Sequence, residues 1–235
     1  MSETNKVTKK SAAETEIEEM GKAGLHFGQA VSKRHPNMEP YIEGVKGTVS
    51  VIDLNKTLEK LEETLAFIKK LKEEGRVIMF VSTKPEFRNL IEDVATDCNM
   101  PYIVNRFLGG TMTNFKTIKK RIDYYNDILK KQESGELDRK YTKQERVKIS
   151  KELEGLEKKF KGMRDMKNIP DAIFVVDMTK DSLAIKEAKM CNVLVIGIAD
   201  TNADPSQADS FIPANDDAIS SVTYILEKIR DVLKK

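Results

Sequence analysis

Apolar residues along the chain fall into short continuous runs, and the segments between several of these runs carry apolar residues at helical spacing. Continuous runs rich in β-branched residues are typical of strands covered on both faces. Five runs predict such strands, at residues 49–54, 77–82, 101–104, 172–177 and 193–199, of which the third is the weakest.

The first helical pattern lies between the first two strands and ends at Gly75. Its apolar residues recur every three or four positions, at Leu58, Leu61, Leu65, Ile68 and Leu71. Further helices are predicted over residues 85–98, 182–190 and 218–232. Strands that alternate with helices favour a parallel sheet with right-handed crossovers. The predicted fold class is therefore α/β, with a Rossmann-like parallel sheet.

Residues 115–166 break this alternation. Apolar residues in this segment keep heptad spacing along two arms, at Ile118, Ile122, Tyr125 and Leu129, and at Ile149, Leu153, Leu156, Phe160 and Met163. Two such arms joined by the polar stretch SGELD predict an antiparallel coiled-coil helical hairpin. Because only one narrow seam is apolar, the hairpin is expected to project from the core.

These patterns divide the chain into three segments. We expect a flexible N-terminal extension at residues 1–17, an α/β core made of residues 18–114 and 167–235, and the coiled-coil hairpin at residues 115–166. Helix is expected to begin only near Ala12, because the acidic residues that follow suit the first half of a helix.

Charge is unevenly distributed along the chain. The 235 residues are 33% charged and 40% hydrophobic, which is typical of a folded globular protein. The net charge is only +2, but residues 115–166 hold 16 Lys or Arg against 10 Asp or Glu, a balance of +6 that leaves −4 for the rest. Positive charge is therefore concentrated on the predicted hairpin.

The two cysteines and the lack of long apolar runs bear on location. Cys98 and Cys191 have neither metal-ligand spacing nor a disulfide pattern, which favours a reducing compartment. No apolar run approaches the roughly 20 residues of a membrane span, and the N-terminus lacks the apolar region of a signal peptide. We expect a cytoplasmic protein without membrane contact.

The strand ends lack the sequence motifs of nucleotide-binding enzymes. A dinucleotide fingerprint G-x-G-x-x-G or a phosphate-binding loop would follow a strand directly. Here the first strand is followed by NKTLEK and the second by TKPEFR. A nucleotide-binding Rossmann-like enzyme is therefore the disfavoured alternative, since glycines are needed for close approach of the backbone to phosphate.

Gly109 and Gly110 open the basic segment and allow two interpretations. They can form a turn through which the chain leaves the sheet, with Thr111 or Thr113 capping the following helix. Alternatively, backbone amides at the start of that helix can contact a phosphate. Cations surround the glycine pair, at Arg106, Lys116, Lys119, Lys120 and Arg121.

Histidines and carboxylates give no strong indication of a metal or catalytic site. His26 and His35 have no ligand partner at zinc spacing, and Lys33, Arg34 and His35 instead form part of an exposed basic loop. Five aspartates gather late in the chain, at Asp200, Asp204, Asp209, Asp216 and Asp217. Such carboxylates can bind a cation or act as acid and base, but turn and helix-capping roles are favoured here.

Six segments together resemble one known family. They are AGLHFGQ (23–29), KRHPNMEPYI (33–42), VIDLNKTLEKLE (51–62), NRFLGGTMTNFKTIKKRI (105–122), PDAIFVVDMTKDSLAIKEA (170–188) and IADTNADPSQADSFIPANDDAISS (198–221). Over residues 18–233 the chain resembles bacterial small-subunit ribosomal proteins of the S-two (uS-two) family.

The resemblance implies a flavodoxin-like sheet with an inserted coiled-coil hairpin. It implies a non-catalytic structural role in the small ribosomal subunit near the junction of head and body, without cofactor or metal. The implied partners are ribosomal RNA and neighbouring ribosomal proteins, including the large S-one protein where one is present. We expect a ribosome-bound chain in the cytoplasm that does not form a homo-oligomer.

Three positions depart from the family pattern. The family usually has a histidine after the HFG glycine and tryptophans in two further motifs, where this chain has Gln29, His35 and Phe107. Each substitute keeps a polar or flat-ring character, so the loops are expected to keep their shape.

The basic loop, the basic arm and the resemblance together predict a set of RNA contacts. Double-helical RNA offers phosphates and ribose hydroxyls more readily than base edges, so Lys and Arg are expected to dominate. The predicted contacts are Lys33, Arg34, His35, Lys46, Lys84, Arg106, Lys116, Lys119, Lys120 and Arg121. The carboxylate-rich face is expected to remain available for basic ribosomal proteins.

Overall fold

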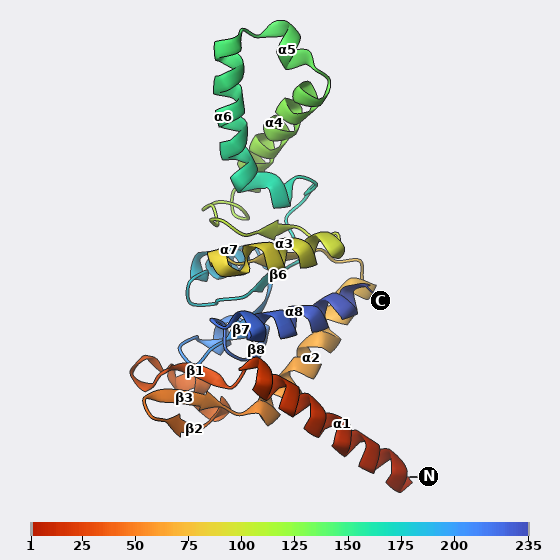
Figure 1. Cartoon of the computed structure of the whole chain (residues 1–235), viewed down its shortest axis with the longest axis vertical. Helices are drawn as coiled ribbons and strands as arrows, with labels where there is room; N and C mark the ends of the chain where they lie inside the picture. Colours follow the sequence, from red (N-terminus) through yellow and green to blue (C-terminus); the bar gives the residue numbers. More distant parts are fainter. Residues whose placement is uncertain (1, 235) are drawn as a thin grey trace.

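The computed structural model describes residues 13–137 and 139–234 in full, and for residues 2–12 and 138 it defines only their place in helices. Figure 1 shows an elongated molecule with a helical hairpin at one end. A five-stranded sheet with its covering helices forms the middle, and a small three-stranded sheet lies with helix α1 (Ser2–Ala23) near the other end.

The five-stranded sheet is parallel throughout. Its strands are β4 (Ile78–Val81), β5 (Tyr102–Ile103), β6 (Ala172–Val175), β7 (Leu194–Ala199) and β8 (Ser210–Pro213). They lie in the order β5-β4-β6-β7-β8. Numbered along the chain, this is the order 2-1-3-4-5 of flavodoxin-like folds, in which the direction of winding reverses between the first and third strands. The predicted α/β class with a Rossmann-like parallel sheet is confirmed.

One predicted strand belongs to a different sheet. The run at residues 49–54 forms β3 (Val49–Ile52), which pairs antiparallel with β1 (Phe27–Ala30) and β2 (Ile42–Lys46). Only every second residue of β3 is buried, which is typical of a sheet with one solvated face. The place of a fifth parallel strand is taken by β8, which lies within a segment that the sequence predicted to be carboxylate-rich loops.

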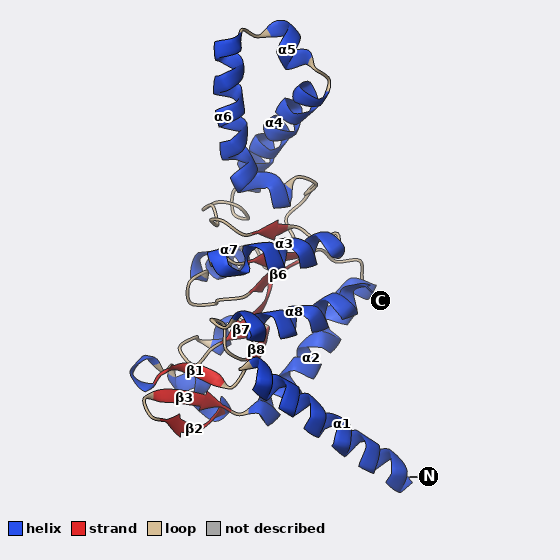
Figure 2. Cartoon of the chain, viewed as in Figure 1, coloured by secondary structure: helices blue, strands red, loops and turns tan. Residues whose placement is uncertain are grey.

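Helices cover both faces of the parallel sheet, and Figure 2 shows them around its strands. One face packs against α2 (Leu54–Glu73), α3 (Arg88–Asp97) and α8 (Ile219–Lys234). Phe80 and Phe174 lie at the centre of this core, with ring centroids 5.6 Å apart. The opposite face packs against α7 (Ser182–Met190) and the root of the hairpin. The hairpin therefore shares its core with the sheet.

The hairpin consists of α4 (Phe115–Glu133) and α6 (Lys143–Phe160), joined through the short helix α5 (Glu136–Lys140). The predicted coiled coil is not confirmed. Figure 1 shows the two arms close together at the core and spread apart toward α5. Burial follows the same gradient, because Phe160 is 4% exposed at the root whereas Val147 is 51% exposed farther out on α6. The seam is therefore closed mainly near the core.

The N-terminal helix starts earlier than the sequence predicted, since α1 extends from Ser2 rather than from Ala12. Its residue Glu16 accepts hydrogen bonds from Tyr224 (3.2 Å) and Lys228 (2.6 Å) of α8. Contact with the core therefore begins before residue 18. The predicted flexibility of residues 1–12 concerns positions outside the fully described residues.

Five short 3-10 helices complete the chain: η1 (Val31–Lys33), η2 (Pro36–Tyr41), η3 (Pro85–Phe87), η4 (Lys161–Met163) and η5 (Pro205–Gln207). Cys98 and Cys191 are unpaired and half-buried. Within the described residues, no helix combines the length and the apolar character that crossing a membrane requires.

Candidate nucleic-acid interface

All the predicted RNA contacts except Lys84 lie in two groups, one on each side of the parallel sheet. One group surrounds the small sheet and comprises Lys33, Arg34, His35 and Lys46, and the other surrounds the hairpin root and comprises Arg106, Lys116, Lys119, Lys120 and Arg121. Figure 1 places the small sheet and the hairpin on either side of the parallel sheet. Lys84 belongs to neither group.

The basic loop at the small sheet is held by its backbone and by two side chains. The amide of His35 donates to the carbonyl of Thr201 at 2.8 Å, and its Nδ1 accepts from the amide of Asn37 at 3.2 Å. Arg34 Nη2 donates to Ser50 Oγ at 3.3 Å. Lys33 and Lys46 are exposed. The loop therefore keeps a fixed backbone while two ammonium groups face solvent.

Among the described residues, four cations at the hairpin root have no hydrogen-bond or ion-pair partner. Arg106, Lys116, Lys120 and Arg121 are exposed, and none of them has a hydrogen bond or ion pair within the described residues. Lys119 differs, because its Nζ donates to the carbonyl of Met166 at 2.9 Å and lies 3.1 Å from Asp123 Oδ1. Lys119 thus ties α4 to the segment that returns to the sheet.

Lys84 lies at the point where flavodoxin-like sheets usually bind their ligands. That point is the crevice at the carboxyl ends of β4 and β6, where the strand order reverses. Nζ of Lys84 lies 2.8 Å from Asp177, 3.0 Å from Asp216 and 2.7 Å from Asp217. The Lys84 side chain is only 12% exposed. Its positive charge is neutralised within the protein.

The electrostatics of this network follow from burial and close charges. Burial alone lowers the pKa of Lys84, but the carboxylates of Asp216, Asp177 and Asp217 outweigh it and raise that pKa above its usual value. Burial raises the pKa of Asp216, as does the neighbouring charge of Asp177, while Lys84 acts in the opposite direction. Burial likewise raises the pKa of Asp200 to about 6.

The same network accounts for the carboxylates that the sequence left open as a cation or acid–base site. Asp200, Asp216 and Asp217 lie close enough together to share a cation. However, Lys84 contacts Asp216 and Asp217, and the side-chain amide of Gln29 donates to Asp217. An ammonium and an amide therefore already pair with oxygens of Asp216 and Asp217.

Helix capping at the end of the chain differs in detail from the prediction. Asn215 Oδ1 accepts from the amides of Asp217 (2.9 Å) and Ala218 (3.2 Å) ahead of α8. The expected capping role thus falls to Asn215, while Asp216 is directed toward Lys84. Asp204 caps η5, since its side chain accepts from the amide of Ser206 at 3.1 Å.

The turn that begins at Gly110 binds the carboxylate of Glu187, a side chain of the protein itself. Gly110 has φ of 89°, a left-handed conformation that favours glycine, and its amide donates to Glu187 at 2.5 Å. The amides of Met112 (3.0 Å) and Thr113 (3.3 Å) donate to the same carboxylate. Glu187 is buried in α7. These three amides are therefore already satisfied by Glu187, which favours the turn over phosphate contact, the two interpretations that the sequence left open.

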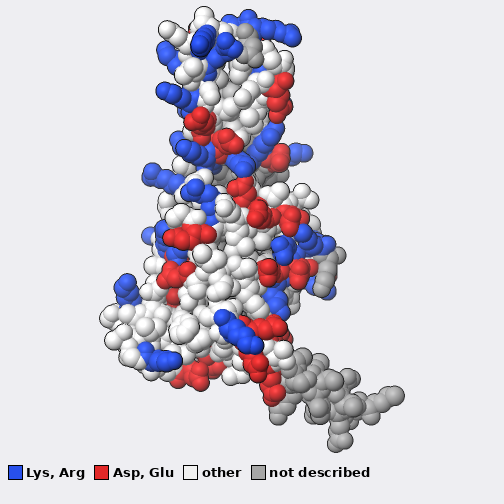
Figure 3. Space-filling view, viewed as in Figure 1, with Lys and Arg blue, Asp and Glu red and all other residues white. Residues whose placement is uncertain are grey.

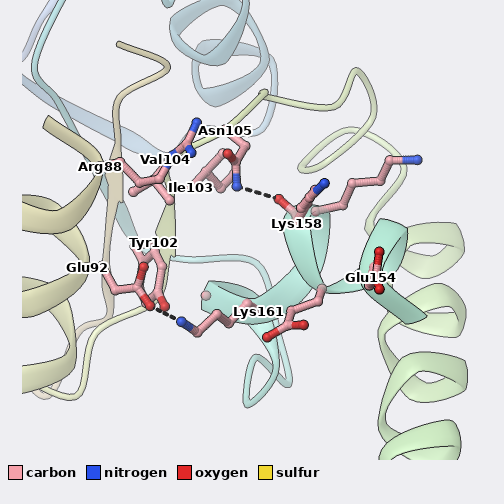
Figure 4. Close-up of a pocket in the computed structure, with 12 residues that line it drawn as sticks. Arg88, Glu92, Tyr102, Ile103, Val104, Asn105, Glu154, Lys158 and Lys161 are labelled. Atoms are coloured by element: carbon pink, nitrogen blue, oxygen red, sulfur yellow. Dashed lines mark hydrogen bonds and ion pairs between the residues drawn. The ribbon is translucent and has the colours of Figure 1, made fainter. Parts of the chain in front are cut away.

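The hairpin root is fixed to the edge of the sheet by polar contacts and a close backbone approach. Figure 4 shows Asn105 reaching toward Lys158 and Glu92 toward Lys161 around a cavity of about 340 Å³. The Asn105 side-chain amide donates to the Lys158 carbonyl at 2.8 Å, and Glu92 and Lys161 form an ion pair. A Cβ at Gly162 would lie 2.3 Å from the carbonyl oxygen of Tyr102, so glycine is required there.

The three departures from the family pattern fit their surroundings. Gln29 supplies an amide to Asp217, and His35 holds the basic loop through Thr201 and Asn37. Phe107 is 6% exposed and packs in the core beneath the hairpin root, so its ring is not available for stacking on a base.

Sequence reasoning missed several residues of this region. Glu187 lies among Ala184, Ile185 and Ala188 on the apolar face of α7, and a carboxylate at such a position indicates a buried partner. Lys167 and Ile169 lie just outside the predicted hairpin bounds, yet they line a hollow at its root together with residues of α4. Heptad spacing ends at Met163 and gives no indication of these two residues.

Basic side chains gather on the hairpin, and the comparison with known families shows which family the chain belongs to. Figure 3 shows Lys and Arg side chains over the hairpin, with Asp and Glu more frequent toward the sheet. The protein-family model described as Ribosomal protein S2 matches residues 20–235, which include both parts of the core and the inserted hairpin. The chain therefore belongs to the ribosomal protein S2 family, whose members are structural components of the small ribosomal subunit and not enzymes.

Proposed function

We propose that this chain binds ribosomal RNA through the cations of its hairpin root and of its basic loop, and that the rigid core between them sets their spacing. The observation that carries this proposal is the set of exposed cations at the hairpin root that have no ion pair with any residue the structure describes in full: Arg106, Lys116, Lys120 and Arg121. Unpaired cations can displace the counterions of RNA phosphates, and this displacement gives salt-dependent affinity.

Lys84 is left out of the proposed RNA surface, although its residue type and position suggested it. An RNA phosphate would have to compete with three carboxylates that lie within 3.0 Å of its Nζ. Arg34 and His35 are assigned a supporting role in the loop, and Lys33 and Lys46 are its direct RNA contacts.

The remaining partners follow from the family. Neighbouring small-subunit ribosomal proteins, including the large S-one protein where one is present, would bind faces that RNA leaves exposed, near the junction of head and body. The chain would then be ribosome-bound in the cytoplasm. The carboxylates at the sheet edge are less suited to this role than the sequence indicated, because Asp177 and Asp216 are buried and paired with Lys84.

Sedimentation tests the proposal against its main rival. A tagged chain expressed in cells is expected to travel with small subunits through a sucrose gradient. A chain that stays at the top of the gradient would contradict the proposal. The rival nucleotide-binding enzyme requires saturable binding of a mononucleotide or dinucleotide by the purified chain, and we expect none, because Lys84 and its carboxylates fill the usual ligand position.

A further experiment separates RNA binding by the hairpin from protein docking by the hairpin. Ultraviolet crosslinking in assembled subunits is expected to join Lys116, Lys120 or Arg121 to RNA. Crosslinks from these residues to protein alone would leave RNA binding to the core and assign the hairpin to a protein partner.

A further inference from the structure

An open hollow of about 540 Å³ lies at the hairpin root, between the start of α4 and the segment that returns from the hairpin to β6. Its volume lies within the range of about 300–1,000 Å³ that is usual for small-molecule sites. The residues that define it are Phe115, Lys116, Lys119, Lys120, Lys167 and Ile169, and we call it the root hollow.

The root hollow is basic and contains no acidic side chain among its described lining residues. Lys116, Lys120 and Lys167 are exposed and have no hydrogen bond or ion pair within the described part of the chain. Lys119 donates to the carbonyl of Met166, which holds the two walls together. Three ammonium groups are therefore available to a ligand, and the bond from Lys119 to Met166 fixes the distance between α4 and the returning segment that carry them.

The second cavity at the hairpin root provides a comparison within the same molecule. It also contains cations, but Glu92, Glu154 and Glu157 line it as well, and Glu92 is paired with Lys161. Its charges are thus largely balanced. Only the root hollow combines several unpaired cations with an absence of carboxylates among the described residues, which favours a ligand with more than one negative charge.

The root hollow also exposes apolar surface next to its lysines. Ile169 is 39% exposed, and the half-buried ring of Phe115 forms part of the lining. Paired RNA offers phosphates and riboses at its surface but keeps the faces of its bases stacked. An unpaired nucleotide offers both a phosphate and the free face of a base, which can stack on apolar and aromatic side chains.

We propose that the root hollow binds an unpaired nucleotide of an RNA strand. The base lies against Phe115 and Ile169, and the flanking phosphates contact Lys116, Lys120 and Lys167. This inference rests on the proposed RNA-binding function and adds a preference for single-stranded RNA at this one position.

Binding of labelled RNA to the purified full-length chain tests the inference. The probes are an oligomer of about ten uridines and a paired RNA duplex of the same length, with uridine monophosphate as a third ligand. Replacing three lysines of the hollow (Lys116→Gln, Lys120→Gln, Lys167→Gln) is expected to weaken binding of the uridine oligomer about tenfold. The matched control replaces three exposed lysines elsewhere on the hairpin (Lys131→Gln, Lys148→Gln, Lys151→Gln), and a loss of about twofold is expected.

Two variants that leave the charge unchanged test the base contact. Ile169→Ser removes a partly exposed apolar side chain, and Phe115→Leu keeps an apolar residue against the core while it removes the aromatic ring. Each is expected to weaken binding of the uridine oligomer about fivefold and to leave duplex binding unchanged. Thermal unfolding of each variant confirms that it is folded.

The possible outcomes separate this inference from the proposed function. If the parent chain binds neither RNA probe, the proposed function itself fails. If it binds RNA but the two lysine triples are equally impaired, or Ile169→Ser and Phe115→Leu leave oligomer binding unchanged, only the root hollow is refuted. Binding of uridine monophosphate as tight as that of the oligomer would also overturn it, because the site would then be one for a free nucleotide.

Discussion

The ligand crevice of the parallel sheet and the hairpin root both concentrate lysine, but they use it in opposite ways. At the crevice, Lys84 is buried among Asp177, Asp216 and Asp217, and its charge forms ion pairs that stabilise the fold. At the hairpin root, Lys116 and Lys120 are exposed and have no protein partner within the described residues. A basic residue of this chain is therefore a candidate RNA contact only where the fold leaves it unpaired.

The same contrast applies to the two phosphate-binding features that the fold offers. A strand crevice and a glycine-rich turn before a helix are both common anion sites. In this chain, the crevice holds the ion pairs of Lys84, and the turn holds the carboxylate of Glu187. Two sites that would bind a nucleotide in an enzyme are thus filled by the protein's own side chains.

The largest effect is expected at the crevice. Lys84→Met leaves buried carboxylates without their cation, which is expected to lower the free energy of unfolding by about 3–5 kcal/mol. Urea denaturation of the purified chain measures this loss. Lys120→Met at the hairpin root is the matched control and is expected to change stability by less than about 0.5 kcal/mol. Equal losses for the two variants would remove the distinction between the regions.

Glu187→Ala is expected to have the next largest effect. It leaves the amides of Gly110, Met112 and Thr113 without their acceptor, at a cost of about 2–4 kcal/mol. Glu187→Gln keeps an acceptor oxygen and is expected to lose less. Added sulfate should raise the melting temperature of Glu187→Ala more than that of the parent, because the freed amides form an anion site. A stability within about 1 kcal/mol of the parent would contradict this role.

The crevice should also make stability depend on pH. Asp200 has a pKa of about 6 in the folded chain against 3.8 ordinarily, so the folded state binds its proton more tightly than the unfolded state does. The contribution of Asp200 to the free energy of unfolding should therefore rise as pH falls from about 7 toward about 4, by about 1–3 kcal/mol. Asp216 acts in the same direction, because its pKa is also raised.

Comparison of the parent with Asp200→Asn isolates the contribution of Asp200 to the pH dependence of the free energy of unfolding. Asp200→Asn should remove its share of the pH dependence and leave that of Asp216. Urea denaturation of both proteins at several pH values gives the two curves. Parallel curves for the parent and the variant would show that Asp200 does not titrate in this window.

The smallest effect on stability is expected at the hairpin root. Substitutions there should reduce RNA binding and leave stability almost unchanged. Lys116→Gln should leave the free energy of unfolding within about 0.5 kcal/mol of the parent. It should reduce the slope of log affinity for RNA against log salt by about one. An unchanged slope would show that Lys116 does not displace a counterion from RNA.

Much of the fold was predictable because apolar patterning reports burial directly. The strands β4, β6 and β7 and the helices α2 and α8 lie where the sequence placed them. The small sheet was not recognised, because β1 and β2 are largely unburied and lack a continuous apolar run. The strand β8 was missed for a different reason, since its four residues lie in a segment dominated by aspartates.

The candidate site was only partly predictable, because charge pairing depends on which residues meet in space. The sequence correctly concentrated positive charge on the hairpin, and the resemblance to the ribosomal family was confirmed by the family match. Pairing of Lys84 with Asp216, 132 positions apart, has no local signal. The separation of the hairpin arms toward α5 was not predictable either, because heptad spacing alone does not determine over what length two helices stay in contact.

Incorporation into small subunits tests the central claim most directly. Cells would express, beside the parent, a tagged chain with Lys116→Glu, Lys120→Glu and Arg121→Glu, or a control chain with Lys131→Glu, Lys148→Glu and Lys151→Glu. Competition is measured as the fraction of each tagged chain in purified small subunits. The hairpin-root variant should be largely excluded while the control is retained; equal incorporation of the two would contradict RNA binding by the hairpin root.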